Sequence, residues 1–142
     1  MKKLILCALF IPMGDKHGSN HVHASGTNLV EVRSGEWPIN LERDVDERDT
    51  SYALLFRDKQ VLTSVLMDTL PFANLTQLKY FGKALTVLKT GNNGDIAKFK
   101  DYSIKRADKK YEGTWFILRD RWCLTDFQQS EADLLISTIK GL

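Results

Sequence analysis

The sequence predicts a small α+β domain in which an antiparallel-rich sheet is packed by two helices, at about 75–90 and 128–140. Strand-like runs precede each of two helical stripes, both helices carry capping signals, and one hairpin sequence recurs along the chain. Because strands and helices are segregated rather than alternating singly, the pattern favours an antiparallel or mixed sheet over βαβ units.

Short apolar and β-branched runs bounded by turn residues predict the strands. They lie at 29–32, 37–41, 52–56, 61–67, 97–104, 114–118 and 122–127. Residues 57–60 form the loop of a predicted hairpin, and Pro38 favours an edge position for its strand because proline lacks the N–H that a central strand needs. A sheet of about six or seven strands is expected.

Capping residues and apolar periodicity predict the helices. Asn74 offers an N-cap with Gln77 three residues on, and the apolar stripe contains Leu75, Leu78, Leu85 and Leu88. The glycine- and asparagine-rich segment 91–94 ends this helix. Thr125 or Asp126 is expected to cap the second helix, whose buried face contains Ala132, Leu135, Ile136 and Ile139.

One sequence pattern occurs twice. Residues 55–63 align with 117–125 at a shift of 62 positions, keeping an Arg-Asp pair and a following Leu-Thr pair. This repetition is consistent with two β-β-α units in tandem. It is also consistent with convergence, because hairpin turns favour Asp and strands favour Leu and Thr.

The N-terminus has the profile of a secretory signal. Lys2 and Lys3 precede the apolar run 4–11, and a polar, glycine-rich stretch follows. We therefore expect residues 1–24 to be a signal peptide and flexible segment, residues 25–142 to form a single α+β domain, and the protein to be secreted or periplasmic. The apolar run is too short for a permanent membrane anchor. If residues 4–11 instead form a buried strand, the protein is cytoplasmic.

Cleavage after residue 24 changes charge and cysteine content. It removes three of 20 basic and one of 18 acidic residues, which leaves 17 of each and no net charge. A neutral domain lacks the overall positive field of non-specific DNA binders. Cleavage also removes Cys7, so Cys123 is expected to be a buried, inert thiol.

Histidine placement restricts the chemistry. His17, His21 and His23 all lie in the low-complexity segment, so the folded part lacks the residue needed for Ser-His-Asp, Cys-His and most zinc-hydrolase mechanisms. A His-x-His motif can bind zinc, copper or nickel, but a mobile or discarded tail is the favoured interpretation. No metal or cofactor is therefore predicted. The favoured function is a non-catalytic exported domain that binds or scaffolds, with a protein or a glycan as partner.

A basic and aromatic segment supports an alternative function, nucleic-acid binding, which requires that the protein not be exported. Its candidate residues are Lys98, Lys100, Tyr102, Lys105, Arg106, Lys109 and Lys110. In topology, doubled strand-and-helix units resemble the Pur-type and Whirly single-strand nucleic-acid binders, although no sequence motif of either family is present. The competing interpretation is an edge strand that its lysines protect from aggregation.

An acidic segment supports a second alternative, a small carboxylate-dependent hydrolase. Its carboxylates are Glu42, Asp44, Asp46, Glu47 and Asp49. An ordinary solvated loop explains the same residues. The hydrolase hypothesis requires a deep pocket that gathers at least two carboxylates with raised pKa values.

Overall fold

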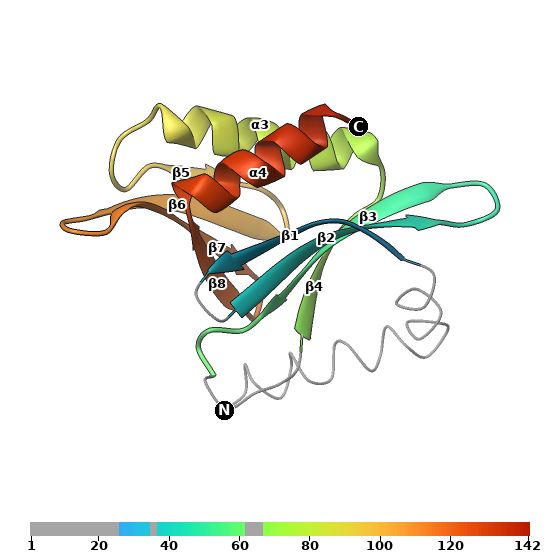
Figure 1. Cartoon of the computed structure of the whole chain (residues 1–142), viewed down its shortest axis with the longest axis horizontal. Helices are drawn as coiled ribbons and strands as arrows, with labels where there is room; N and C mark the ends of the chain where they lie inside the picture. Colours follow the sequence, from blue (N-terminus) through green and yellow to red (C-terminus); the bar gives the residue numbers. More distant parts are fainter. Residues whose placement is uncertain (1–25, 35–36, 62–66) are drawn as a thin grey trace.

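The computed structural model describes residues 26–34, 37–61 and 67–142, in which four strands followed by a helix occur twice (Figure 1). The first unit contains β1 (Thr27–Ser34), β2 (Trp37–Val45), β3 (Thr50–Arg57), β4 (Met67–Phe72) and α3 (Leu75–Lys89). The second unit contains β5 (Ile96–Lys98), β6 (Tyr102–Lys109), β7 (Gly113–Asp120), β8 (Leu124–Gln128) and α4 (Gln129–Lys140). The predicted α+β class with two packing helices is confirmed.

The described strands divide between two antiparallel sheets, with orders β1-β2-β3-β4 and β5-β6-β7-β8. This differs from the single sheet of six or seven strands that the sequence predicted. Successive strands pair within each unit, whereas α3 separates β4 from β5 along the chain. The repeating unit is consequently β-β-β-β-α, of which the recurring hairpin and the following helix are the last part.

Both units share one hydrophobic core. The largest fully buried side chains include Phe56 and Phe72 from the first sheet, Phe81 from α3, and Phe116 and Phe127 from the second sheet. Helix α4 contacts β1 of the first unit as well as β7 and β8, and α3 contacts β6 of the second unit as well as β3 and β4. Each helix therefore packs on strands of both units, which interlocks them.

The start of α3 confirms the predicted cap. The Asn74 side chain accepts a hydrogen bond from the Gln77 N–H at 2.9 Å, and the Gln77 side chain accepts one from the Ala73 N–H at 2.8 Å. These bonds satisfy N–H groups that the helix leaves without partners at its first turn.

The predicted cap of α4 was wrong by two or three residues. Thr125 and Asp126 both belong to β8, where Thr125 is buried and Asp126 pairs with Lys59. The helix instead begins after Gln128, whose N–H donates to the Glu131 side chain at 3.3 Å. Tertiary pairing in the sheet holds both polar residues in the strand, against their local preference for caps.

Two strand predictions also need correction. Pro38 lies in β2, which pairs with both β1 and β3 and is not an edge strand; proline is tolerated there because the pairing of β2 with β3 begins only at Ile39, so Pro38 has a strand neighbour on the β1 side alone. The single strand predicted at 97–104 is divided into β5 and β6 by a turn in which the Phe99 N–H donates to the Tyr102 carbonyl at 2.8 Å. The strand predicted at 61–67 falls mostly outside the described residues.

Cys123 is buried and disulfide-bonded, so the prediction of an inert thiol was wrong. A disulfide sulfur has no titratable proton and supplies no thiolate. The other cysteine, Cys7, the three histidines and the predicted signal peptide lie outside the described residues. Neither α3 nor α4 combines the length and apolar character that a membrane-crossing helix requires.

Candidate functional site

The outer face of the second sheet gathers basic side chains around a tryptophan. Residues directly opposite one another in the register share a face: Lys98 with Ser103, Lys105 with Ile117, and Ala107 with Trp115. Ile104, Phe116 and Leu118 alternate with these residues and are buried on the inner face, beneath the helices. We call the outer set the basic face; it consists of Lys98, Lys105, Lys109, Trp115, Ile117 and Arg119.

Trp115 lies between two lysines on this face. The Lys109 Nζ is 4.1 Å from the centroid of the indole ring, and the Lys59 Nζ, from the first unit, is 5.9 Å away. Lys59 also pairs with Asp126 of β8 at 2.5 Å, which fixes its position beside the sheet. Ammonium groups at such distances are attracted to the indole ring and also provide positive charge for an anionic ligand.

The corresponding face of the first sheet carries mixed charge. The alternation that places Ile39, Leu54 and Phe56 in the core directs the intervening residues outward. The charged residues on this outer face are Glu31, Arg33, Glu42, Asp44 and Arg57. The two units share their topology, but among the residues described the outer face of the second sheet is predominantly basic, with Asp126 of β8 opposite Ile117 as an acidic member that pairs with Lys59.

Arg106, one of the predicted binding residues, has a structural position instead. It lies on the inner face of β6, and its Nη1 donates to the carbonyls of Leu88, Lys89 and Gly91 at 3.0, 2.7 and 2.9 Å. Its Nε pairs with Asp108 at 3.1 Å. The guanidinium therefore satisfies carbonyl groups at the C-terminus of α3. A positive charge there also interacts favourably with the negative end of the helix dipole.

Tyr102 is likewise turned away from the basic face. Its ring lies 4.5 Å from that of Phe99 and about 6 Å from those of Phe72 and Phe81, measured between ring centroids. Burial raises the pKa of the Tyr102 hydroxyl. Of the other predicted residues, Lys98, Lys105 and Lys109 lie on the basic face, while Lys100 and Lys110 lie in the turns at its two ends.

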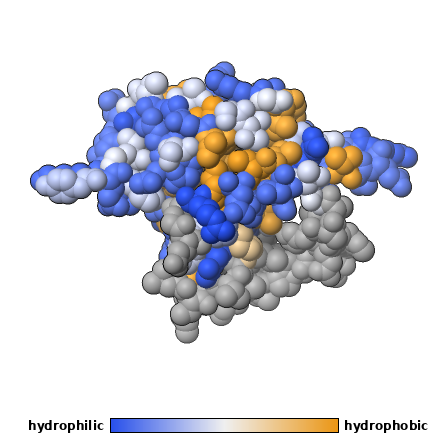
Figure 2. Space-filling model, in the orientation of Figure 1, coloured by the Kyte–Doolittle hydropathy of each residue, from blue (hydrophilic) through white to orange (hydrophobic). Residues whose placement is uncertain are grey.

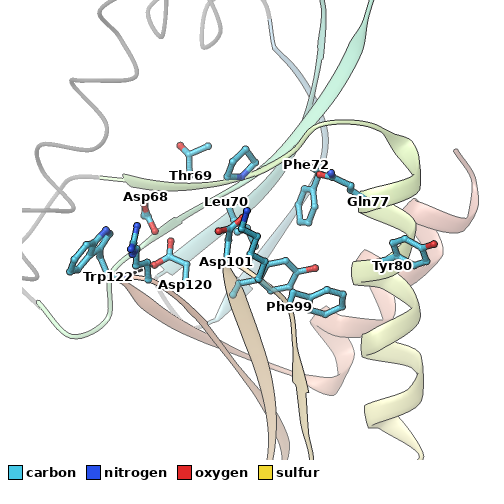
Figure 3. A pocket seen from close by; sticks show the side chains of 14 residues that line it. Asp68, Thr69, Leu70, Phe72, Gln77, Tyr80, Phe99, Asp101, Asp120 and Trp122 are labelled. Atoms are coloured by element: carbon cyan, nitrogen blue, oxygen red, sulfur yellow. Dashed lines mark hydrogen bonds between the residues drawn. The ribbon is translucent and has the colours of Figure 1, made fainter.

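A cavity of about 680 Å³ lies beside the second sheet, between β4, the start of α3 and the turns that follow β5 and β7 (Figure 3). Aromatic rings of Phe72, Phe99, Tyr102 and Trp122 form much of its wall. Asp68 and Asp120 line one end and point toward each other. We call this cavity the carboxylate pocket.

The two carboxyl groups of this pocket have different environments. Asp120 Oδ1 accepts hydrogen bonds from the N–H groups of Trp122 and Cys123 at 2.9 and 2.7 Å. Asp68 is only 4% exposed, and its Oδ2 has no hydrogen-bond partner. Burial, together with the hydrogen bond and negative charge of Asp120, raises the pKa of Asp68 to about 9. Asp68 is therefore protonated at neutral pH.

A third carboxylate, Asp58, lies close enough to Asp68 to act on it electrostatically. It is 4% exposed, and its Oδ1 accepts hydrogen bonds from the N–H groups of Gln60 and Leu124 at 3.1 and 3.0 Å. Its negative charge also contributes to the raised pKa of Asp68. Its Oδ2 has no partner.

The acidic segment singled out in the sequence does not line the carboxylate pocket. Residues 46–49 form the turn between β2 and β3, at the hydrophilic tip of a projecting hairpin (Figures 1 and 2). Asp46 accepts a hydrogen bond from the neighbouring Glu47 N–H at 2.6 Å. The carboxylates that do converge, Asp58, Asp68 and Asp120, come from three different strands or turns. Only the Arg-Asp repetition could have indicated two of them.

Comparison with known proteins gives a partial similarity. The chain is 30% identical over 97 residues to the DNA-directed RNA polymerase subunit beta of Geobacter sp. (strain M21), and 29% identical over the same length to that of Citrifermentans bemidjiense. Each match covers 66% of this chain but only 7% of the polymerase subunit. No family model matches the chain.

Proposed function

We propose that this protein binds single-stranded nucleic acid on the basic face of its second sheet. The observation that carries the proposal is the row of Lys98, Lys105, Lys109 and Arg119 on the face that also presents Trp115. Cationic side chains attract the phosphates, and an aromatic ring stacks on an unpaired base.

Geometry favours single strands over duplexes. The basic residues follow an open sheet surface rather than a helix that could enter a duplex groove. Sheet surfaces that bear aromatic residues bind splayed bases. Lys109 covers the indole ring, and its flexible side chain can move its ammonium from the ring to a phosphate.

Two further observations support a nucleic-acid ligand. The partial relatives are subunits of a DNA-directed RNA polymerase. The two strand-and-helix units also have the arrangement on which the topological resemblance to the Pur-type and Whirly binders rests.

This proposal places the protein in a compartment that contains nucleic acid, whereas the predicted signal peptide implies export. The nucleic-acid function and export predict different results when the mature protein is located by cell fractionation and its mass is measured. A full-length chain in the cytoplasm supports the nucleic-acid function. A processed chain outside the cytoplasm supports the exported binding or scaffolding domain with a protein or glycan partner.

Fluorescence anisotropy with a labelled 20-nucleotide single strand tests binding directly. Changing Lys98, Lys105, Lys109 and Arg119 to Gln should abolish most binding and reduce the salt dependence by up to about three counterions, at about 0.7 per contact. The matched control changes four exposed basic residues elsewhere, Arg33, Lys79, Lys83 and Lys140, to Gln. An equal loss in both variants would contradict a localised site and indicate only a net-charge effect.

A further inference from the structure

We propose that the carboxylate pocket is a site for a hard divalent cation of the Mg²⁺ or Mn²⁺ type, held by Asp68 and Asp120. The oxygens that these two side chains can offer lie within 4.8 Å of each other. Asp68 Oδ2 is without a partner although the residue is 96% buried, and it borders a cavity of about 680 Å³. The site does not depend on the proposed nucleic-acid function.

The charge balance of this region favours a cation. Asp58, Asp68 and Asp120 converge there, and none of them takes part in an ion pair between described residues. Lys100 and Arg121 also line the pocket, but neither forms an ion pair with Asp68 or Asp120 among the described residues, and the Arg121 guanidinium lies 5.6 Å from the centroid of the Trp122 ring. Lys59 pairs with Asp126. Neighbouring buried carboxylates repel each other unless a proton or a metal ion lies between them.

The donor atoms select the class of metal. Carboxylate oxygens suit Mg²⁺, Mn²⁺ and Ca²⁺, whereas zinc and copper prefer imidazole or thiolate ligands. The Cys123 sulfur lies near the pair but belongs to a disulfide, and the sequence has no histidine beyond residue 23. Mg²⁺ commonly binds through one or two carboxylates and keeps several waters, for which the adjoining cavity provides space.

Asp58 has a supporting position in this arrangement. Its Oδ1 is fixed by the Leu124 N–H, from the strand that follows Asp120. Its Oδ2 is buried and has no partner. A negative charge held there increases the attraction of the pocket for a cation without requiring that Asp58 contact the ion.

Calorimetric titration of chelator-treated full-length protein with MnCl₂ tests the proposal. We expect one site per chain, and we expect Asp68→Asn and Asp120→Asn each to weaken Mn²⁺ binding at least about tenfold. Asn is nearly the same size as Asp and keeps one acceptor oxygen, so circular dichroism should show a folded protein. Asp101→Asn is the matched control, because Asp101 lines the same pocket but is exposed and lies outside the pair.

A second variant excludes weak binding at the projecting acidic turn. Asp46→Asn combined with Asp49→Asn should leave the titration unchanged. Mn²⁺ should also raise the melting temperature of the wild type but not that of Asp68→Asn. Absence of wild-type binding at about 1 mM Mn²⁺, a concentration typical of weak divalent sites, would overturn the proposal. Loss of binding in the acidic-turn variant with retention in Asp68→Asn would do the same.

Discussion

The buried carboxylate of Asp58 accepts a hydrogen bond from the backbone N–H of Leu124 at 3.0 Å, which joins the turn of the first unit to the second. The adjacent Lys59 N–H donates to the carbonyl of the same leucine at 2.7 Å. Gln60 completes the connection by donating to the Trp122 carbonyl at 3.4 Å. The recurring Arg-Asp turns therefore lie against each other in the fold, although 62 residues separate their aspartates.

Asp58→Ala should destabilise the protein by about 1–3 kcal/mol, because it leaves the partly buried N–H of Leu124 without its acceptor. Asp58→Asn should cost less, since the amide oxygen can still accept and the repulsion on Asp68 is removed. Urea unfolding measures both values. Equal losses in the two variants would show that charge, rather than the hydrogen bond, is the property that matters at this position.

Asp68 should make the metal-free protein less stable as the pH rises. Its pKa is about 9 in the folded chain and about 4 when unfolded, so between these values the folded state holds a proton that the unfolded state has released. The stabilisation is complete below about pH 4 and is lost as the pH approaches 9, by at most about 1.4 kcal/mol per pH unit.

Urea unfolding of wild type and Asp68→Asn in EDTA, at several pH values from 5 to about 9, measures this dependence. The variant should show a flatter profile, because Asn does not titrate. Asp101→Asn serves as the control for removing an exposed carboxylate from the same pocket. A wild-type profile that parallels that of Asp68→Asn would refute the raised pKa.

Substitutions of the neighbouring residues Arg106 and Lys105 of β6 should have different effects: the first should lower stability, and the second should weaken nucleic-acid binding. Arg106→Gln removes the donor to three carbonyls at the end of α3 and should cost about 2–4 kcal/mol of stability, within the range for losing a buried charged partner. Lys105→Gln should leave stability within about 0.5 kcal/mol and weaken nucleic-acid binding. Thermal melts measure the stability of both variants, and fluorescence anisotropy measures their nucleic-acid binding. If Arg106→Gln stays fully folded and loses more binding than Lys105→Gln, these assignments are contradicted.

Local signals predicted the elements well, and pairing between distant residues accounts for what they missed. Asn74 and Gln77 specify the start of α3 within a few residues of chain, so the sequence predicted it correctly. Arg106 and Lys105 are chemically similar, so the sequence alone could not tell their roles apart. The register of β6 places Arg106 on the inner face of the sheet and Lys105 on the outer, basic face. Nothing in the sequence near Asp68 indicated that it belongs to a site, because its partner Asp120 is brought to it only by the packing of the two units.

Trp115 should supply the stacking part of the proposed nucleic-acid site. Trp115→Ala should weaken binding of a single strand by about 1–3 kcal/mol, the value of one base–aromatic contact, whereas Trp115→Phe should retain much of it. The loss should persist at high salt, because stacking does not depend on counterion release. Replacing Lys109 with Gln should have the opposite salt response, with a loss that is largest at low salt. Equal losses in Trp115→Phe and Trp115→Ala, measured by anisotropy on variants with wild-type melting temperatures, would show that the indole ring does not stack on a base.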